Sequence, residues 1–205
     1  MTLLDSESEE QKRILAAVNT LSRTCESEVE HVKHVSHLTL RLFDEMADIH
    51  QLGNEDRFHL KCAAILHDIG WVEGWKNHHK AALKIILETT MLPIDHRDRL
   101  IIGSIARYHR KALPVLSHDH FAALNPPDRQ KVQILAAFLR LADGLDRTHR
   151  GKIKDLICRV KKNQIQIQCF STFPSSEELK GGMEKADLFS LVFDREVKIK
   201  IVPLL

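Results

Sequence analysis

The sequence has 205 residues, enough for one sizeable domain or for one domain with a small appendage. It is 43% hydrophobic and 28% charged, as ordinary globular proteins are, and its net charge of +2 argues against a dedicated nucleic-acid binder. No apolar run approaches the roughly 20 residues that a membrane span needs. The polar start lacks the apolar segment of a signal peptide, so we expect a cytoplasmic protein with reduced thiols at Cys25, Cys62, Cys158 and Cys169.

Helical periodicity dominates the first 150 residues. Apolar residues recur at helical spacing soon after the polar start, and a clearly amphipathic helix follows. The next helix is apolar on most sides, which predicts a central, buried element ended by Gly70. The helices expected after the first are 30–50, 56–69, 78–90, 96–109 and 128–147.

The pattern changes after Gly151. Residues 155–160 and 164–170 alternate apolar and polar side chains around a Lys-Lys-Asn turn, which predicts a β-hairpin. A helix near 183–193 and a last strand at 197–201 complete the chain, and we interpret Gly181-Gly182 as a turn.

These elements predict a mainly α fold in two parts. A helical bundle would occupy residues 1–152, and a small α+β appendage with the order ββαβ would occupy residues 153–205. The free edge of the hairpin could mediate a homodimer.

The His67-Asp68 pair ends the most apolar helix. A buried carboxylate costs several kcal/mol unless it is paired or binds a metal. By itself the dipeptide is equally consistent with a capped helix end, so its meaning depends on the other helices.

One of the chain's 13 histidines stands out on the 30–50 helix. At ~100° per residue, His31 lies within about 20° of the centre of the apolar stripe. His34 lies at the edge of that stripe and His37 points away, so both are expected to be solvated.

An acidic residue faces the core of the 128–147 helix. The apolar face that runs through Val132, Ala136 and Leu139 arrives at Asp143, with Asp146 close beside it. A buried aspartate satisfied by a backbone amide or an arginine is the structural alternative. Taken together, His31, His67, Asp68 and Asp143 make two imidazoles and two carboxylates, a set suited to Mn, Fe, Mg, Zn, Co or Ni without distinguishing among them.

The order H…HD…D resembles the HD superfamily of metal-dependent phosphohydrolases. More narrowly, four segments resemble the helical C-terminal region of the exopolyphosphatase/guanosine pentaphosphate phosphatase (Ppx/GppA) family over roughly residues 15–202. These segments are HVKHVSHLTLRLF from His31, AILHDIG around His67-Asp68, RYHRK from Arg107 and LRLADGLDR from Leu139. The resemblance implies an HD-domain helical bundle with an intact ligand set. The N-terminal actin-like ATPase region that holds the phosphatase site in two-part members has no counterpart here, so exopolyphosphatase activity does not carry over.

In binuclear HD proteins, histidines from equivalent helices bind a second ion, which here suggests His78, His79 and His109. The alternative is that these are surface residues, because neighbouring histidines at the start of a helix are commonly exposed. Basic side chains gather near the same helix ends, where they could bind phosphate or form a solvated surface. Among these residues, Lys80, Arg107, Arg110, Lys111, Arg147 and Arg150, we single out Arg110, Lys111 and Arg147, with His109, as candidate substrate-binding residues.

The resulting hypothesis is a metal-dependent phosphohydrolase. Its substrate would be a small phosphate ester or anhydride, such as a nucleotide or a polyphosphate-like molecule. Asp68 would orient the attacking water as ligand or base, with His67 beside it at the catalytic centre. The alternative is a non-catalytic regulatory or binding module that senses a phosphorylated ligand or partner.

Overall fold

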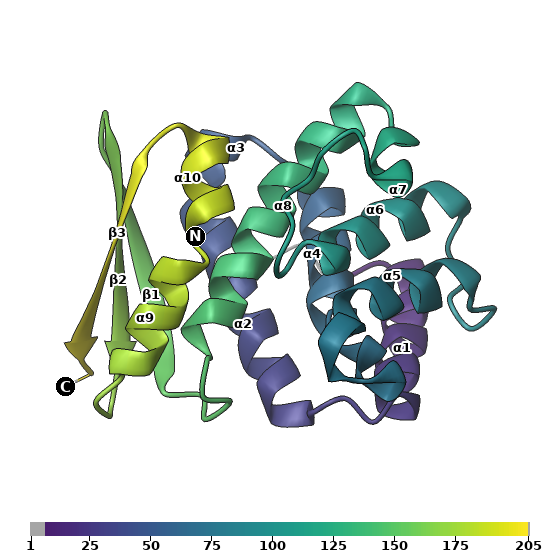
Figure 1. Ribbon diagram of the computed structural model, residues 1–205, viewed down its shortest axis with the longest axis horizontal. Coiled ribbons are helices and arrows are strands. Elements are labelled where there is room, and N and C mark those ends of the chain that lie inside the picture. Colours follow the sequence, from purple (N-terminus) through teal and green to yellow (C-terminus); the bar gives the residue numbers. More distant parts are fainter. Residues whose placement is uncertain (1–6, 205) are drawn as a thin grey trace.

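The computed structural model describes residues 7–204 and confirms a mainly α fold with a small C-terminal α+β appendage (Figure 1). None of the helices in this range has the length and hydropathy to span a bilayer. The helical part comprises α1 (Glu9–Thr24), α2 (Val29–Glu45), α3 (Ala47–His50), α4 (Asn54–Leu66), α5 (His78–Glu88), α6 (His96–Arg107), α7 (Asp119–Ala122) and α8 (Pro126–Leu145), with short 3-10 turns η1 (Ile69–Glu73) and η2 (Trp75–Asn77). The appendage comprises β1 (Ile153–Val160), β2 (Gln164–Ser171), α9 (Ser176–Glu184), α10 (Asp187–Phe193) and β3 (Glu196–Pro203).

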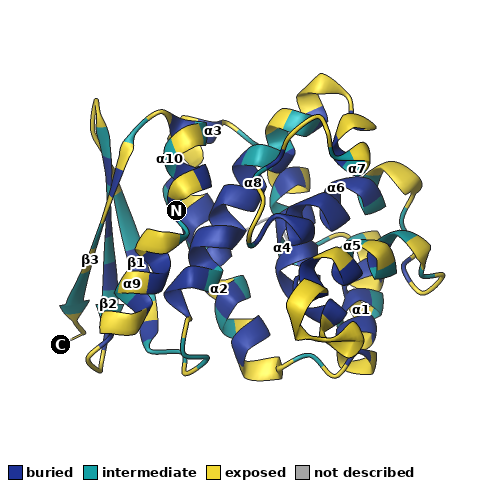
Figure 2. Cartoon of the chain, in the orientation of Figure 1, coloured by how far each residue is buried: buried dark blue, intermediate teal, exposed yellow. Residues whose placement is uncertain are grey.

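Helix α8 is the central element of the fold. Asn125 caps its start by accepting the backbone N–H of Asp128, and Pro126 and Pro127 occupy the first turn, where no intrahelical N–H bond is needed. The helix then packs against α2, α4 and α6 on the bundle side and against α9 and α10 on the appendage side. Its buried surface is visible in the middle of Figure 2. This position explains why α8 is apolar on most of its circumference.

The appendage is a three-stranded sheet covered by helices on one face (Figure 1). Strands β1 and β2 form the expected antiparallel hairpin, and β3 pairs with β2 in parallel because α9 and α10 carry the chain back across the sheet. Ile165, Ile167 and Cys169 alternate inward and join the same hydrophobic core as the helical bundle. The division of the chain at residue 152 stays a prediction.

Two details of the predicted appendage are wrong. The helix expected near 183–193 corresponds to α10, but α9 before it was not predicted, so the order of the appendage is ββααβ. Gly181-Gly182 lies inside α9 and not in a turn. These glycines are needed for a close approach: a Cβ on Gly144 of α8 would lie 2.5 Å from the carbonyl oxygen of Gly181, so only glycines let the two backbones meet.

Candidate metal centre

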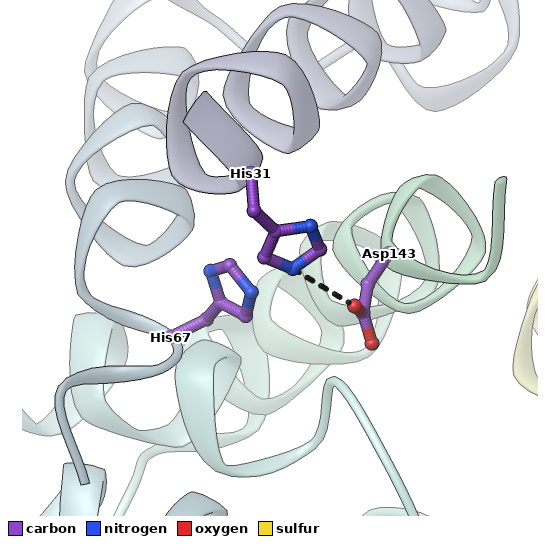
Figure 3. Close-up of side chains that lie close together, drawn as sticks. All are labelled: His31, His67 and Asp143. Carbon is purple, nitrogen blue, oxygen red and sulfur yellow. Dashed lines mark ion pairs between the residues drawn. The ribbon is translucent and has the colours of Figure 1, made fainter. Parts of the chain in front are cut away.

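Three helices bring the predicted ligands together (Figure 3). His31 projects from α2, His67 from the end of α4 and Asp143 from α8, and all three lie in the core. The Nε2 atom of His31 is 3.5 Å from Oδ1 of Asp143. His31, placed by its position on the apolar stripe, therefore faces the carboxylate that the α8 pattern placed in the core.

The Asp68 carboxylate faces two groups of histidines. Its Oδ2 atom lies 3.4 Å from Nε2 of His67 and 3.6 Å from Nε2 of His31. Its Oδ1 atom lies 3.2 Å from Nε2 of His78 and 3.7 Å from Nε2 of His109. Asp68 thus lies between one set of possible ligands, His31, His67 and Asp143, and a second set, which it forms with His78 and His109.

The second set depends on tight backbone packing at the start of α5. A Cβ on Gly70 would collide with the carbonyl oxygen of His78, so glycine is required where η1 crosses α5. This contact places His78 beside His109 at the end of α6, with their Nε2 atoms 3.1 Å apart.

Backbone carbonyls orient the imidazoles. Nδ1 of His67 lies 2.7 Å from the oxygen of Ala64, and Nδ1 of His109 lies 2.7 Å from that of Ala106. In the same way, Nδ1 of His78 lies 3.0 Å from the carbonyl oxygen of Trp75. A proton on each Nδ1 leaves the Nε2 lone pair directed at the cluster, as metal-binding histidines require.

The buried nitrogens lack partners of their own. Nε2 of His31 and Nε2 of His67 are inaccessible and make no hydrogen bond within the described residues. Burial lowers the pKa of His67 and holds that of His109 well below its usual range, so both rings are neutral. Neutral imidazoles facing carboxylates in a closed site are suitable ligands for a divalent cation.

Neighbouring groups keep both carboxylates ionised despite their burial. Burial opposes ionisation of Asp68, but His67, His78 and His109 outweigh it and hold its pKa well below the usual range. The pKa of Asp143 is likewise lowered well below its usual range, because the charge of Lys185 and the facing His31 ring, 3.5 Å away, exceed the cost of burial. Lys185, at the end of α9, contacts Oδ2 of Asp143 directly.

Two residues outside the predicted set support His31. Oδ2 of Asp146 lies 2.8 Å from Nδ1 of His31, on the side of the ring away from the cluster. The His149 ring stacks on His31 with 3.7 Å between centroids, and Glu28 holds His149 through a 2.7 Å contact with its Nδ1. In the sequence, the position of Asp146 one turn after Asp143 indicated that it lies near the cluster. No sequence pattern indicated the positions of His149 and Lys185.

A small pocket opens onto the cluster. It has a volume of about 100 Å³, and Asp68 contributes to its wall. Trp71 and His149 also line it, and the segment before α2 contributes two acidic residues. Its lining residues are Glu26, Ser27, Glu28, Asp68, Trp71 and His149.

The other predicted site residues lie around this centre at different depths. His79 is buried but belongs to neither ligand set. Arg110 lies close to the second set, with Nη1 3.4 Å from the ring nitrogens of His78 and its guanidinium over the Trp75 ring. Lys111 donates to the carbonyl oxygen of Lys76. Arg147 is exposed, and its Cβ and Cγ lie beside Gly181 of α9.

His34 and His37, the two histidines that the helical wheel predicted to be solvated, differ in their exposure. His34 is half-buried, with Nε2 3.9 Å from Oδ1 of Asp146, and His37 is exposed and contacts the carbonyl oxygen of Lys154. Neither side chain belongs to either ligand set.

The fold and the site define a class: a mainly helical domain with buried histidines and aspartates gathered between its helices. Residues 14–182 match the family model described as Ppx/GppA phosphatase, domain III, so the chain belongs to that family. This match confirms the resemblance drawn from the sequence motifs. No curated protein matches the chain.

Proposed function

We propose that the chain is a metal-dependent phosphohydrolase that acts on a small phosphate ester or anhydride, such as a nucleotide or a polyphosphate-like molecule. The observation that carries this proposal is the position of Asp68, whose two carboxylate oxygens face two separate groups of histidines. A carboxylate shared in this way is suited to bridge two divalent ions. The family's phosphatase description supports the same chemistry.

The ligand roles follow from the two groups. His31, His67 and Asp143 would hold the first ion, and His78 and His109 would hold the second, with Asp68 between them. Mn, Fe, Mg, Zn, Co and Ni all accept such mixed nitrogen and oxygen ligands. Divalent ions at these positions would acidify water and polarise a phosphoryl oxygen.

The chain's own side chains would bind and orient the substrate. Asp68 lies in the wall of the pocket, which supports a role for this candidate ligand in orienting an attacking water. Arg110 beside His78 would bind a non-reacting phosphate through charge-assisted hydrogen bonds, and Lys111 and Arg147 are the further cations proposed for substrate binding.

One observation favours the alternative, a regulatory or binding module. Lys185, a cation of the chain itself, neutralises Asp143. A site that balances its own charges in this way could fold and bind a phosphorylated ligand without turning it over.

Turnover separates the two functions. Metal-free protein is supplied with Mn²⁺ and tested for phosphate release on a panel of nucleotides, short polyphosphates and simple phosphate esters. We expect Mn²⁺-dependent turnover that Asp68→Asn reduces by about 100-fold or more, whereas Asp48→Asn, the same substitution at an exposed position, leaves it unchanged. Bound metal without turnover on every substrate would favour the binding module.

A further inference from the structure

Arg107, the last residue of α6, is a buried cation without a counter-ion. Its exposed fraction is 5%, and its Nη1 atom is inaccessible and makes no hydrogen bond within residues 7–204. No carboxylate of those residues forms an ion pair with it, and burial lowers the pKa of the guanidinium. Arginine stays charged even so, and an unpaired buried charge costs a large part of its hydration free energy.

Two further polar nitrogens near Arg107 also lack partners. Nδ1 of His79 on α5 and Nε2 of His120 on α7 are inaccessible and make no hydrogen bond within the described chain. Helices α5 and α7 both pack on α6. Three elements therefore bring unpaired polar groups to the end of α6.

Aromatic rings pack around Arg107. The guanidinium lies 5.6 Å from the centroid of the Tyr108 ring, and Tyr108 contacts both His118 and His120, which stack on each other. The hydroxyl of Tyr108 lies 2.8 Å from Nδ1 of His118. His118 and His120 are half-buried, so the α7 side of this group is its most exposed side.

The charge around this group is positive. Burial and the Arg107 charge lower the pKa of His120 to about 4, and both also lower that of His118. Within residues 7–204, the carboxylate that acts on these two rings is that of the exposed Asp119. A buried guanidinium beside neutral imidazoles, each able to donate one hydrogen bond, is suited to an oxyanion.

We propose that Arg107, His79 and His120 form an anion site that binds a phosphate group, separate from the His/Asp centre. Phosphate fits because arginine binds it through two parallel hydrogen bonds and because its charge would compensate the buried cation. The site is next to the second ligand set: His79 follows His78 in the sequence, and the rings of His79 and His109 lie 6.4 Å apart between centroids. A phosphate held there could be free inorganic phosphate or the phosphoryl group of an ester.

The test is titration calorimetry of the full chain, stripped of metal and kept in chelator so that phosphate cannot bind an ion. Inorganic phosphate is titrated at constant ionic strength, followed by phenyl phosphate. We expect one phosphate per chain and at least about tenfold weaker binding in Arg107→Met, the loss of a charge-assisted bond. Binding of inorganic phosphate alone identifies a free-phosphate site, and binding of both identifies a phosphoryl site.

Matched variants separate this site from other causes. Arg159→Met makes the same substitution on the exposed face of β1 and should bind phosphate like the parent protein. Asp68→Asn should also bind phosphate, because the anion site is independent of the candidate metal centre. Arg107→Met should melt at the same or a higher temperature without phosphate, since the unpaired charge is gone.

A second variant covers the case in which Arg107→Met fails to fold. His120→Phe keeps the aromatic packing against Tyr108 and His118 but removes Nε2, and should weaken phosphate binding severalfold. Absence of phosphate binding by the parent protein at millimolar concentrations would overturn the proposal. Equal binding by the parent, Arg107→Met and His120→Phe would overturn it as well.

Discussion

Asp146 contacts His31 on the side of the ring that faces away from the ligand cluster. Its Oδ2 atom lies 2.8 Å from Nδ1 of His31, and its Oδ1 atom accepts the backbone N–H of Gly151 at 2.9 Å. The contact with Gly151 fixes the orientation of the Asp146 carboxylate. The contact with His31 holds a proton on Nδ1 of the imidazole. Nε2 of His31, on the opposite side of the ring, is thereby left to face Asp143 and Asp68.

Asp146→Asn should therefore weaken metal binding. Loss of a carboxylate behind a metal-binding histidine typically reduces affinity by about 10–100-fold. We expect this reduction in a Mn²⁺ titration, with the helical circular dichroism of the parent retained. Asp48→Asn on the exposed surface is the control, and equal affinity in both variants would show that Asp146 has no such role.

Metal binding should release a proton from His31. Burial opposes the charged ring, but Asp143, Asp146 and Asp68 outweigh it and raise the pKa of His31 to about 10 in the metal-free chain. Because the pKa is raised, protonation of His31 contributes to the stability of the metal-free fold. This contribution is fully present below pH 6.5 and is lost as the pH rises through about 10. A metal ion must displace that proton.

Between pH 6.5 and 10 the affinity for Mn²⁺ should then rise about tenfold per pH unit through this one proton. Calorimetric titrations in buffers with different ionisation enthalpies count the protons released. A binding enthalpy that does not depend on the buffer in this range would contradict a protonated His31.

The contact between α8 and α9 should not tolerate a side chain. Gly181→Ala places a Cβ against the carbonyl oxygen of Gly144, a backbone atom that cannot rotate away. We expect a loss of about 1–3 kcal/mol in the free energy of unfolding, measured by urea denaturation. Gly53→Ala, where nothing lies within 4 Å of the new Cβ, should unfold like the parent protein.

Arg147 should act on the substrate and not on the metal. Arg147→Ala is expected to raise KM, lower kcat/KM, or both, while the metal content per chain is retained. Arg147→Lys should recover only part of the loss, because an ammonium cannot make the two-pronged guanidinium contact. Metal analysis and phosphoester kinetics on the same preparations test this, with Arg159→Ala as the exposed control. Loss of metal in Arg147→Ala, or parental kinetics, would contradict the assignment.

The sequence predicted the parts of the centre that lie on strongly periodic helices. The wheel of α2 distinguishes His31 from His34 and His37, and the apolar face of α8 leads to Asp143. Contacts between residues far apart in the sequence leave no local pattern from which they could be predicted. His31 and Asp146 are 115 residues apart, and Lys185 reaches Asp143 from a helix of the appendage.

The appendage shows the same limit in its secondary structure. Gly181-Gly182 has poor helix propensity, so the local sequence favours a turn. Packing against Gly144 stabilises α9 across both glycines instead, a reason that appears only when α8 and α9 are seen together. The alternating hairpin of β1 and β2 depends on local pattern and was predictable.

The most direct measurement of the central claim is the Mn²⁺ stoichiometry of the metal-free chain, followed by electron paramagnetic resonance of the loaded protein. If Asp68 bridges two ions, the parent should bind two Mn²⁺ per chain whose spectra show exchange coupling. Asp68→Asn should bind fewer ions and lose the coupling. Two uncoupled ions, or no Mn²⁺ retained at His31, His67 and Asp143, would contradict the account.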